Sequence, residues 1–98
     1  MNPIHDHCRT YQKNPSVACT ELDDGAVLLN LDTKYYFNLN ETGLRIWQIM
    51  EEFRTPVEIA AKLALEYDVD VERAKASVVR LLGELEKEEL IISQQKGR

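Results

Sequence analysis

Two histidines and two cysteines are the side chains best suited to bind a metal ion in this chain. His5, His7 and Cys8 lie together near the N-terminus, and Cys19 follows downstream. Imidazole and thiolate groups are good ligands for zinc and copper. The spacing is neither Cys-x-x-Cys nor His-x-x-x-His, and the segment shows no periodic pattern. We therefore expect any metal binding here to be incidental, and we predict no metal site and no cofactor.

The same residues are poor candidates for covalent catalysis. A cysteine nucleophile needs a histidine held rigidly beside its thiol, and both histidines lie in the N-terminal segment, where no rigid element is predicted. Glu84, Glu86, Glu88 and Glu89 surround Lys87 near the C-terminus. This crowding is typical of a solvated helix face rather than of an acid–base pair. The pattern predicts a binding protein and not an enzyme.

The composition is that of one small soluble domain. With 98 residues, 44% hydrophobic and 30% charged, the chain has enough apolar material for its own core. Its net charge of -5 is a poor match for nucleic-acid phosphates. The longest apolar run, residues 26–29, is too short to span a membrane, and the N-terminus lacks the apolar segment of a secretory signal. We expect a cytoplasmic protein with reduced cysteines and no membrane partner.

Turn signals and alternating apolar residues predict three short strands ahead of any helix. Residues 1–16 are polar and aperiodic, and we expect a flexible arm there. Strands are predicted over residues 17–22, 26–31 and 34–39, separated by Asp-Asp-Gly and Asp-Thr turns. Because the connections are short, the strands should form an antiparallel meander. Its first and third strands would leave two open edges.

Alternation along the second and third strands predicts which side chains face the core. The side chains expected on the buried face are Val27, Leu29, Leu31, Tyr35, Phe37 and Leu39. Those expected on the opposite face are Asn30, Tyr36 and Asn38. Consecutive strand residues point in opposite directions, so one of Tyr35 and Tyr36 is expected to be partly exposed. An exposed aromatic side chain at a free edge is a hint of peptide binding.

After residue 39 the hydrophobic period lengthens from two residues to about 3.6, which is typical of helices. Asn40 is the predicted N-cap of a first helix that runs to about residue 53. Thr55 begins a capping box with proline at the first helical position, so a second helix is predicted to about residue 66. Asp70 is the predicted N-cap of a third helix over residues 71–88.

The third helix is predicted to be amphipathic. Its apolar stripe is Val71, Ala74, Val78, Leu81 and Leu85, flanked by Val79 and Leu82. Three strands followed by three helices predict an α+β fold, with the small antiparallel sheet covered on one face by helices. The predicted organisation is a flexible arm over residues 1–16, a domain over residues 17–92 and a tail over residues 93–98.

The second and third helices could also form a helix-turn-helix. A helix that reads DNA needs a basic exposed face. The third helix instead mixes Arg73, Lys75 and Arg80 with several glutamates. A small winged-helix DNA-binding regulator is therefore kept only as the alternative hypothesis. Metal handling by the N-terminal arm is a third hypothesis.

Residues from about Tyr11 to Ile92 resemble the PqqD-like family. The matching positions are Gly25, Leu28-Leu29, Tyr36-Phe37-x-Leu39-Asn40, Gly43, Ile46-Trp47, Thr55, Ile59, Leu63, Leu81-Leu82, Leu85 and Leu90-Ile91. The segment from Tyr36 to Trp47 is the most specific part of the match. His5, His7 and Cys8 are not part of the family pattern, so the resemblance does not explain the arm.

The resemblance implies a winged-helix-like fold and a non-catalytic role as a peptide chaperone. The family includes the peptide chaperone of pyrroloquinoline quinone (PQQ) biosynthesis and the recognition elements for other ribosomally made, modified peptides (RiPPs). Such a protein binds the leader segment of a precursor peptide and presents it to a modifying enzyme. In the quinone pathway that enzyme is a radical S-adenosylmethionine protein. The open edge also leaves a monomer or a weak dimer as the expected state.

The resemblance further implies that the leader adds as a strand beside the third strand and lies against the third helix. Backbone groups of a sheet edge give affinity, and pockets for alternate side chains give selectivity. On the strand, the residues implied to bind peptide are Lys34, Tyr35, Tyr36, Phe37, Asn38 and Leu39. On the helix, spacing indicates Lys75, Val78, Val79 and Leu82.

Overall fold

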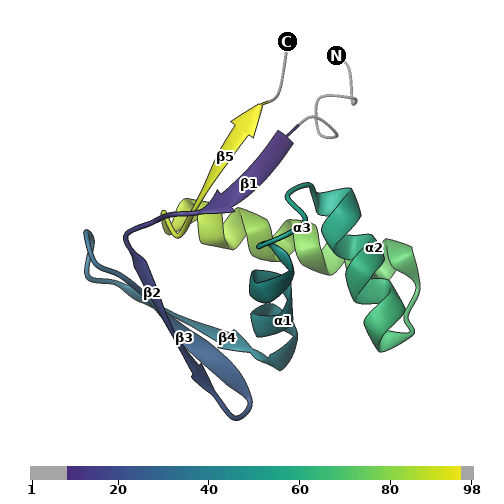
Figure 1. The fold of residues 1–98 in the computed structure, drawn as a ribbon, viewed down its shortest axis with the longest axis horizontal. Helices are drawn as coiled ribbons and strands as arrows, with labels where there is room; N and C mark the ends of the chain where they lie inside the picture. The colour runs from purple at the N-terminus through teal and green to yellow at the C-terminus, as the bar shows by residue number, and fades with distance from the viewer. Residues whose placement is uncertain (1–8, 96–98) are drawn as a thin grey trace.

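The computed structural model describes residues 9–95, which form two small antiparallel sheets and three helices (Figure 1). The elements in chain order are β1 (Arg9–Lys13), β2 (Val17–Leu22), β3 (Gly25–Asn30), β4 (Tyr36–Asn40), α1 (Glu41–Ile49), α2 (Pro56–Tyr67), α3 (Val71–Lys87) and β5 (Ile91–Gln95). The predicted order of three sheet strands followed by three helices is confirmed. No helix in this part of the chain combines the length and apolar character needed to cross a membrane.

The main sheet is the predicted meander, with strand order β2-β3-β4. Its third strand begins later than expected, because Lys34 adopts a positive φ of 69° and its backbone N–H donates to the Asn30 carbonyl. Lys34 and Tyr35 therefore belong to the turn that precedes β4. Both edges of the sheet, at β2 and β4, are free of a partner strand within residues 9–95.

The face predicted for β3 is wrong, because the opposite set of side chains is buried. Ala26 and Leu28 are almost inaccessible, whereas Val27 and Leu29 are half-buried and Leu31 is exposed. Both faces of this strand are largely apolar, so alternation alone could not choose between them. The partners of Ala26 and Leu28 on β4 are Leu39 and Phe37, which do pack towards the helices as predicted.

Asn30 lies on the buried face despite its polar side chain. It is 1% exposed, and its side-chain nitrogen donates to the Glu89 carbonyl at 3.0 Å. Its side-chain oxygen accepts from the backbone N–H groups of Asp32 and Thr33 at 2.9 and 3.1 Å. Asn30 thus ties the turn before β4 to the segment that follows α3.

The register of β3 against β4 depends on Gly25. A Cβ atom at this position would lie 2.0 Å from the Leu39 carbonyl oxygen, which belongs to the backbone and cannot rotate away. We expect Gly25→Ala to destabilise the fold by about 1–3 kcal/mol. Chemical denaturation of the two proteins measures the difference.

Gly83 supplies the matched control for Gly25. It lies on the exposed side of α3, and an added Cβ would meet no atom within 4 Å. Gly83→Ala should therefore stabilise the protein by about 0.5–1 kcal/mol through helix propensity alone. Equal effects of the two alanines in the same denaturation experiment would contradict the close approach at Gly25.

The second sheet, β1 with β5, differs from the expectation of a flexible arm over residues 1–16 and of a tail outside the domain over residues 93–98. Arg9–Lys13 pairs antiparallel with Ile91–Gln95, so residues 9–13 and 93–95 belong to the folded domain. Lys13 also donates to Glu51 at 2.6 Å and lies 4.6 Å from the centre of the Trp47 ring. These contacts attach β1 to the end of α1. The pairing of β1 with β5 was not predicted, because residues so distant in the chain leave no local sequence signal. His5, His7 and Cys8 lie outside the described residues.

The predicted helix starts are confirmed. Asn40 accepts from the backbone N–H of Gly43 at 2.8 Å, and Thr55 accepts from that of Glu58 at 3.2 Å. Asp70 is the N-cap of α3, although its side chain makes no capping bond. The first helix ends at Ile49, four residues earlier than expected, and a turn follows it.

The core lies between one face of the main sheet and the three helices. Its most deeply buried large side chains are Leu28, Ile46, Met50, Ile59, Val78, Leu82, Leu85 and Leu90. Trp47 is 4% exposed and is part of this core, as predicted. On α3 the buried stripe is shifted from the predicted one, with Leu82 replacing Leu81 and Val71 exposed.

Candidate functional site

The backbone of β4 alternates between groups that bond to β3 and groups that do not. Asn30 donates its backbone N–H to the Tyr35 carbonyl at 3.0 Å. Antiparallel strands exchange such bonds at every second residue pair. With the observed register, the backbone groups of Phe37 and Leu39 therefore face β3.

The backbone N–H and C=O groups of Tyr36 and Asn38 consequently point to the open edge. Within residues 9–95 no strand pairs with this edge. Tyr36 is 71% exposed, and Asn38 is also exposed. The edge thus presents donors and acceptors to which an extended chain could bond.

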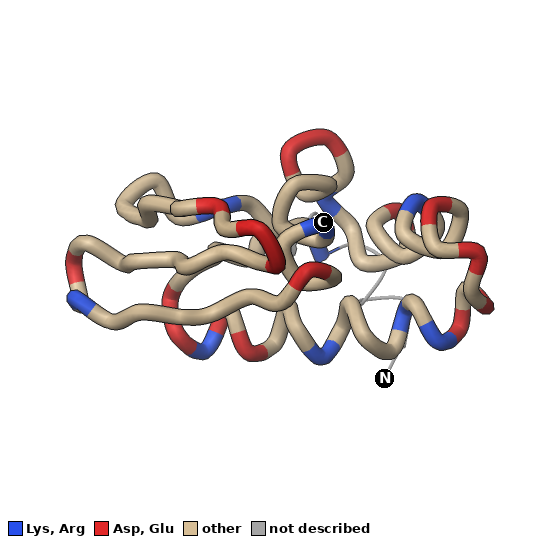
Figure 2. The backbone as a smooth tube through the Cα atoms, turned by 90° about the horizontal axis from the view of Figure 1, so that it is seen from below, with Lys and Arg blue, Asp and Glu red and all other residues tan. Residues whose placement is uncertain are grey.

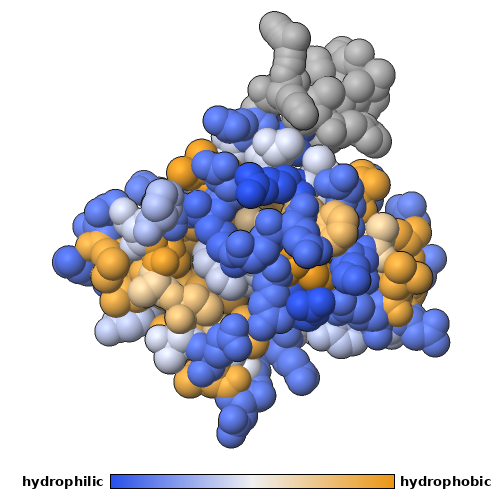
Figure 3. All heavy atoms as spheres, viewed as in Figure 1, coloured by the Kyte–Doolittle hydropathy of each residue, from blue (hydrophilic) through white to orange (hydrophobic). Residues whose placement is uncertain are grey.

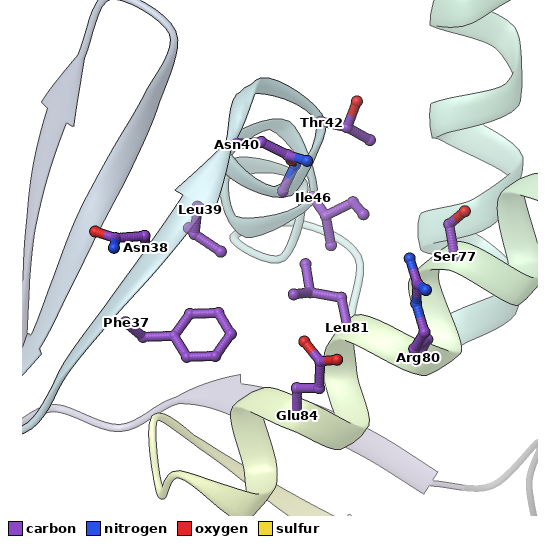
Figure 4. Close-up of a pocket in the computed structure, with 11 residues that line it drawn as sticks. Phe37, Asn38, Leu39, Asn40, Thr42, Ile46, Ser77, Arg80, Leu81 and Glu84 are labelled. Carbon is purple, nitrogen blue, oxygen red and sulfur yellow. The ribbon is translucent and has the colours of Figure 1, made fainter.

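A pocket of about 350 Å³ lies between β4 and α3 (Figure 4). Its lining residues are Phe37, Asn38, Leu39, Asn40, Thr42, Gly43, Ile46, Ser77, Arg80, Leu81 and Glu84. Figure 4 shows the side chains of Phe37 and Leu81 directed towards the space between the strand and the helix. The open edge of β4 therefore borders a hollow whose far wall is α3.

The predicted strand residues contribute unequally to this pocket. Phe37, Asn38 and Leu39 line it. Lys34, Tyr35 and Tyr36 do not, although all three are exposed. Both tyrosines are exposed, where only one was expected, because Tyr35 lies in the turn and not in the strand.

On the helix, the structure brings a different set of side chains to the pocket from the predicted one. Val78 and Leu82 are 0% and 1% exposed and belong to the core. Lys75 and Val79 are not among the lining residues. The wall is formed instead by Ser77, Arg80, Leu81 and Glu84. The pocket wall thus lies on a different flank of α3 from the one that helical spacing indicated.

Apolar side chains are also exposed away from the pocket. Figure 3 shows them in separate patches, one of which lies over the main sheet. Leu22, Leu31 and Tyr35 are 52%, 48% and 67% exposed. These side chains lie at the ends of the sheet, so they do not form part of the pocket wall.

The charge distribution does not resemble that of a DNA-binding surface. Figure 2 shows basic and acidic residues interspersed along the chain, without a continuous basic stripe in the view. The basic residues of α3 share the helix with three glutamates: the charged side chains are Glu72, Arg73, Lys75, Arg80, Glu84, Glu86 and Lys87. Neutralising phosphates requires a concentration of positive charge that α3 does not offer.

Residues 9–95 hold no cluster suited to metal binding, and Cys19 is not activated as a nucleophile. No three His, Cys, Asp or Glu side chains among residues 9–95 are placed to hold a metal ion. Partial loss of hydration and the charge of Glu21 raise the pKa of the Cys19 thiol, and the thiolate is the reactive form. Cys19 thus lacks the environment of an activated nucleophile.

Comparisons with known proteins point to one family. The family model described as "Coenzyme PQQ synthesis protein D (PqqD)" matches residues 25–91. The solved structure of TbiB1 in complex with the TbiA(beta) leader peptide is 35% identical, with a TM-score of 0.74 over 82% of this chain and 93% of that chain. Lasso peptide synthetase B1 complexed with the leader peptide is 26% identical, with a TM-score of 0.73 over 84% of this chain and 96% of that chain. A comparison with curated proteins gives no match.

Proposed function

The chain belongs to the PqqD family, and we propose that it binds the leader segment of a ribosomally made precursor peptide without itself catalysing a reaction. The structures of two similar proteins were solved in complex with leader peptides, which supports this role. The observation that carries the proposal is the open edge of β4, which borders the pocket in front of α3. An extended segment placed there can bond to the backbone and bury a side chain at the same time.

The proposed contacts combine the strand edge with the pocket. The backbone groups of Tyr36 and Asn38 would bond to the leader, because they are the groups of β4 that face away from β3. Phe37 and Leu81 would receive an apolar side chain. Val78 and Leu82 support the helix from the core and do not touch the leader.

The bound leader would be presented to a separate modifying enzyme. Family membership supports a radical S-adenosylmethionine enzyme as that partner. Precursor peptides are made by ribosomes in the cytoplasm, so a protein that binds them before modification would act in the cytoplasm. The open strand edge is compatible with a monomer or a weak dimer. A disordered leader loses conformational entropy on binding, so the affinity should be moderate.

A titration of the isotope-labelled protein tests the proposal. The probe is the leader of the precursor peptide encoded beside the gene for this chain. We expect amide shifts that concentrate on β4 and on the part of α3 from Ser77 to Glu84. The absence of shifts at saturating leader concentration would overturn the proposed function, and shifts confined to β2 would overturn the proposed site.

A further inference from the structure

Two side chains of opposite charge border the pocket between β4 and α3. Arg80 and Glu84 lie about one turn apart on α3, and both line the pocket. Figure 4 shows Glu84 on the side of Phe37, and Arg80 beside Ser77 on the side of Thr42. The pocket therefore has an acidic end and a basic end.

Neither charge is neutralised within the part of the chain that the structure describes. The ion pairs of residues 9–95 join Lys13 to Glu51, and Glu66 to Arg45 and Lys62. Arg80 and Glu84 are exposed and belong to none of these pairs. Both charges are thus available to a ligand in the pocket.

Between the two charged ends the pocket has an apolar floor within a lining that is otherwise polar. Leu39 and Ile46 are buried beneath it, while Phe37 and Leu81 are half-buried and reach its surface. An apolar side chain placed on Phe37 and Leu81 would remove their exposed area from water. Such burial is favourable by about 25 cal/mol for each Å² of apolar surface.

The spacing of the charges fits an extended peptide. Four residues of α-helix rise by about 6 Å, and two residues of a β-strand advance by about 6.6 Å. In a segment with one apolar side chain at the centre, the two neighbours that project to the same side are four positions apart, about 13 Å along the strand. The long, exposed side chains of Arg80 and Glu84 therefore have to extend outward along the strand by a few Å each to meet them.

On the basis of the proposed function, we propose that the pocket selects leaders by charge order. The preferred segment has an apolar residue with an acidic residue two positions to one side, facing Arg80, and a basic residue two positions to the other, facing Glu84. Along β4 the chain runs from the Glu84 end to the Arg80 end. Antiparallel pairing is the more stable arrangement. The segment therefore reads acidic-x-apolar-x-basic from its N-terminus.

Selection from a random linear peptide library tests this order without knowledge of the natural leader. The wild-type chain should enrich the acidic and the basic residue by roughly two- to fivefold each, the range expected for exposed charge pairs. The double variant R80E/E84K should enrich the reverse order. In about 1 M salt both preferences should disappear, while the preference for the central apolar residue should persist.

A second double variant also exchanges one basic and one acidic residue on α3, so its net charge is unchanged, but both substituted positions lie outside the pocket. Arg73 and Glu72 do not line it, so R73E/E72K should select the same order as the wild type. The same order selected by the wild type and by R80E/E84K would overturn the charge proposal and leave strand addition intact. Selected peptides whose binding is unaffected by Tyr36→Pro would overturn the proposed site itself.

Discussion

Replacing Tyr36 with proline should weaken leader binding by about tenfold or more while the protein remains folded. The register directs the Tyr36 N–H to the open edge, so proline removes a donor that the leader would use and places its ring in the path of the added strand. Tyr36 is the first residue of β4, a position where a sheet tolerates proline. Isothermal titration with the leader measures the loss.

Two control variants separate the backbone effect from other causes. Tyr36→Ala removes the exposed ring but keeps the N–H, and we expect it to retain most of the affinity. Cys19→Pro removes an outward N–H from the other edge, because the bond from Leu31 N–H to the Ser16 carbonyl sets the alternation along β2. If Cys19→Pro weakened binding as much as Tyr36→Pro, the leader would not be specific for the β4 edge. Circular dichroism checks that each variant folds.

Replacing Asn30 with leucine should destabilise the protein by about 2–4 kcal/mol. The change removes three hydrogen bonds and leaves the Glu89 carbonyl and two turn N–H groups without their side-chain partner, at about 0.5–1.5 kcal/mol for each bond. A loss of this size should lower the melting temperature by roughly 4–8 °C per kcal/mol. Thermal unfolding followed by circular dichroism measures it.

Asn14 offers the matched control for Asn30. Its side-chain nitrogen donates to the same Glu89 carbonyl at 2.8 Å in an exposed bond, and its side-chain oxygen accepts from the Ser16 N–H at 2.9 Å in a part-buried one. Asn14→Leu loses two bonds, one of them exposed, where Asn30→Leu loses three, so it should cost only about 1–2 kcal/mol. Because Asn30 holds the turn before β4 against the end of α3, we also expect Asn30→Leu to weaken leader binding. An Asn30 variant as stable as the Asn14 variant would contradict the buried network.

Local patterns predicted the elements well where the deciding contacts are local. The caps at Asn40 and Thr55 join residues three apart, so the sequence shows them directly. The strand β2 and the start of α2 follow from turn and proline signals in the same way. The strand edge that borders the pocket could be located for this reason, even though its register was unknown.

Features that depend on distant residues could not be predicted. The buried face of β3 includes Asn30, whose side-chain nitrogen donates to the Glu89 carbonyl 59 positions away. The pairing of β1 with β5 joins residues such as Arg9 and Gln95, which share no local pattern. On α3 both Leu81 and Leu82 fit an apolar stripe, and only packing against the other elements buries Leu82 and leaves Leu81 at the pocket.

Amide hydrogen exchange of β4, measured with and without the leader, tests the central claim most directly. In the free protein the Tyr36 and Asn38 amides should exchange fast, because they face the open edge. The Phe37 and Leu39 amides should exchange slowly, because they bond to β3. Leader binding should slow Tyr36 and Asn38 and leave Cys19 on the β2 edge unchanged. Leader binding that leaves the exchange of Tyr36 and Asn38 unaltered would contradict strand addition at β4.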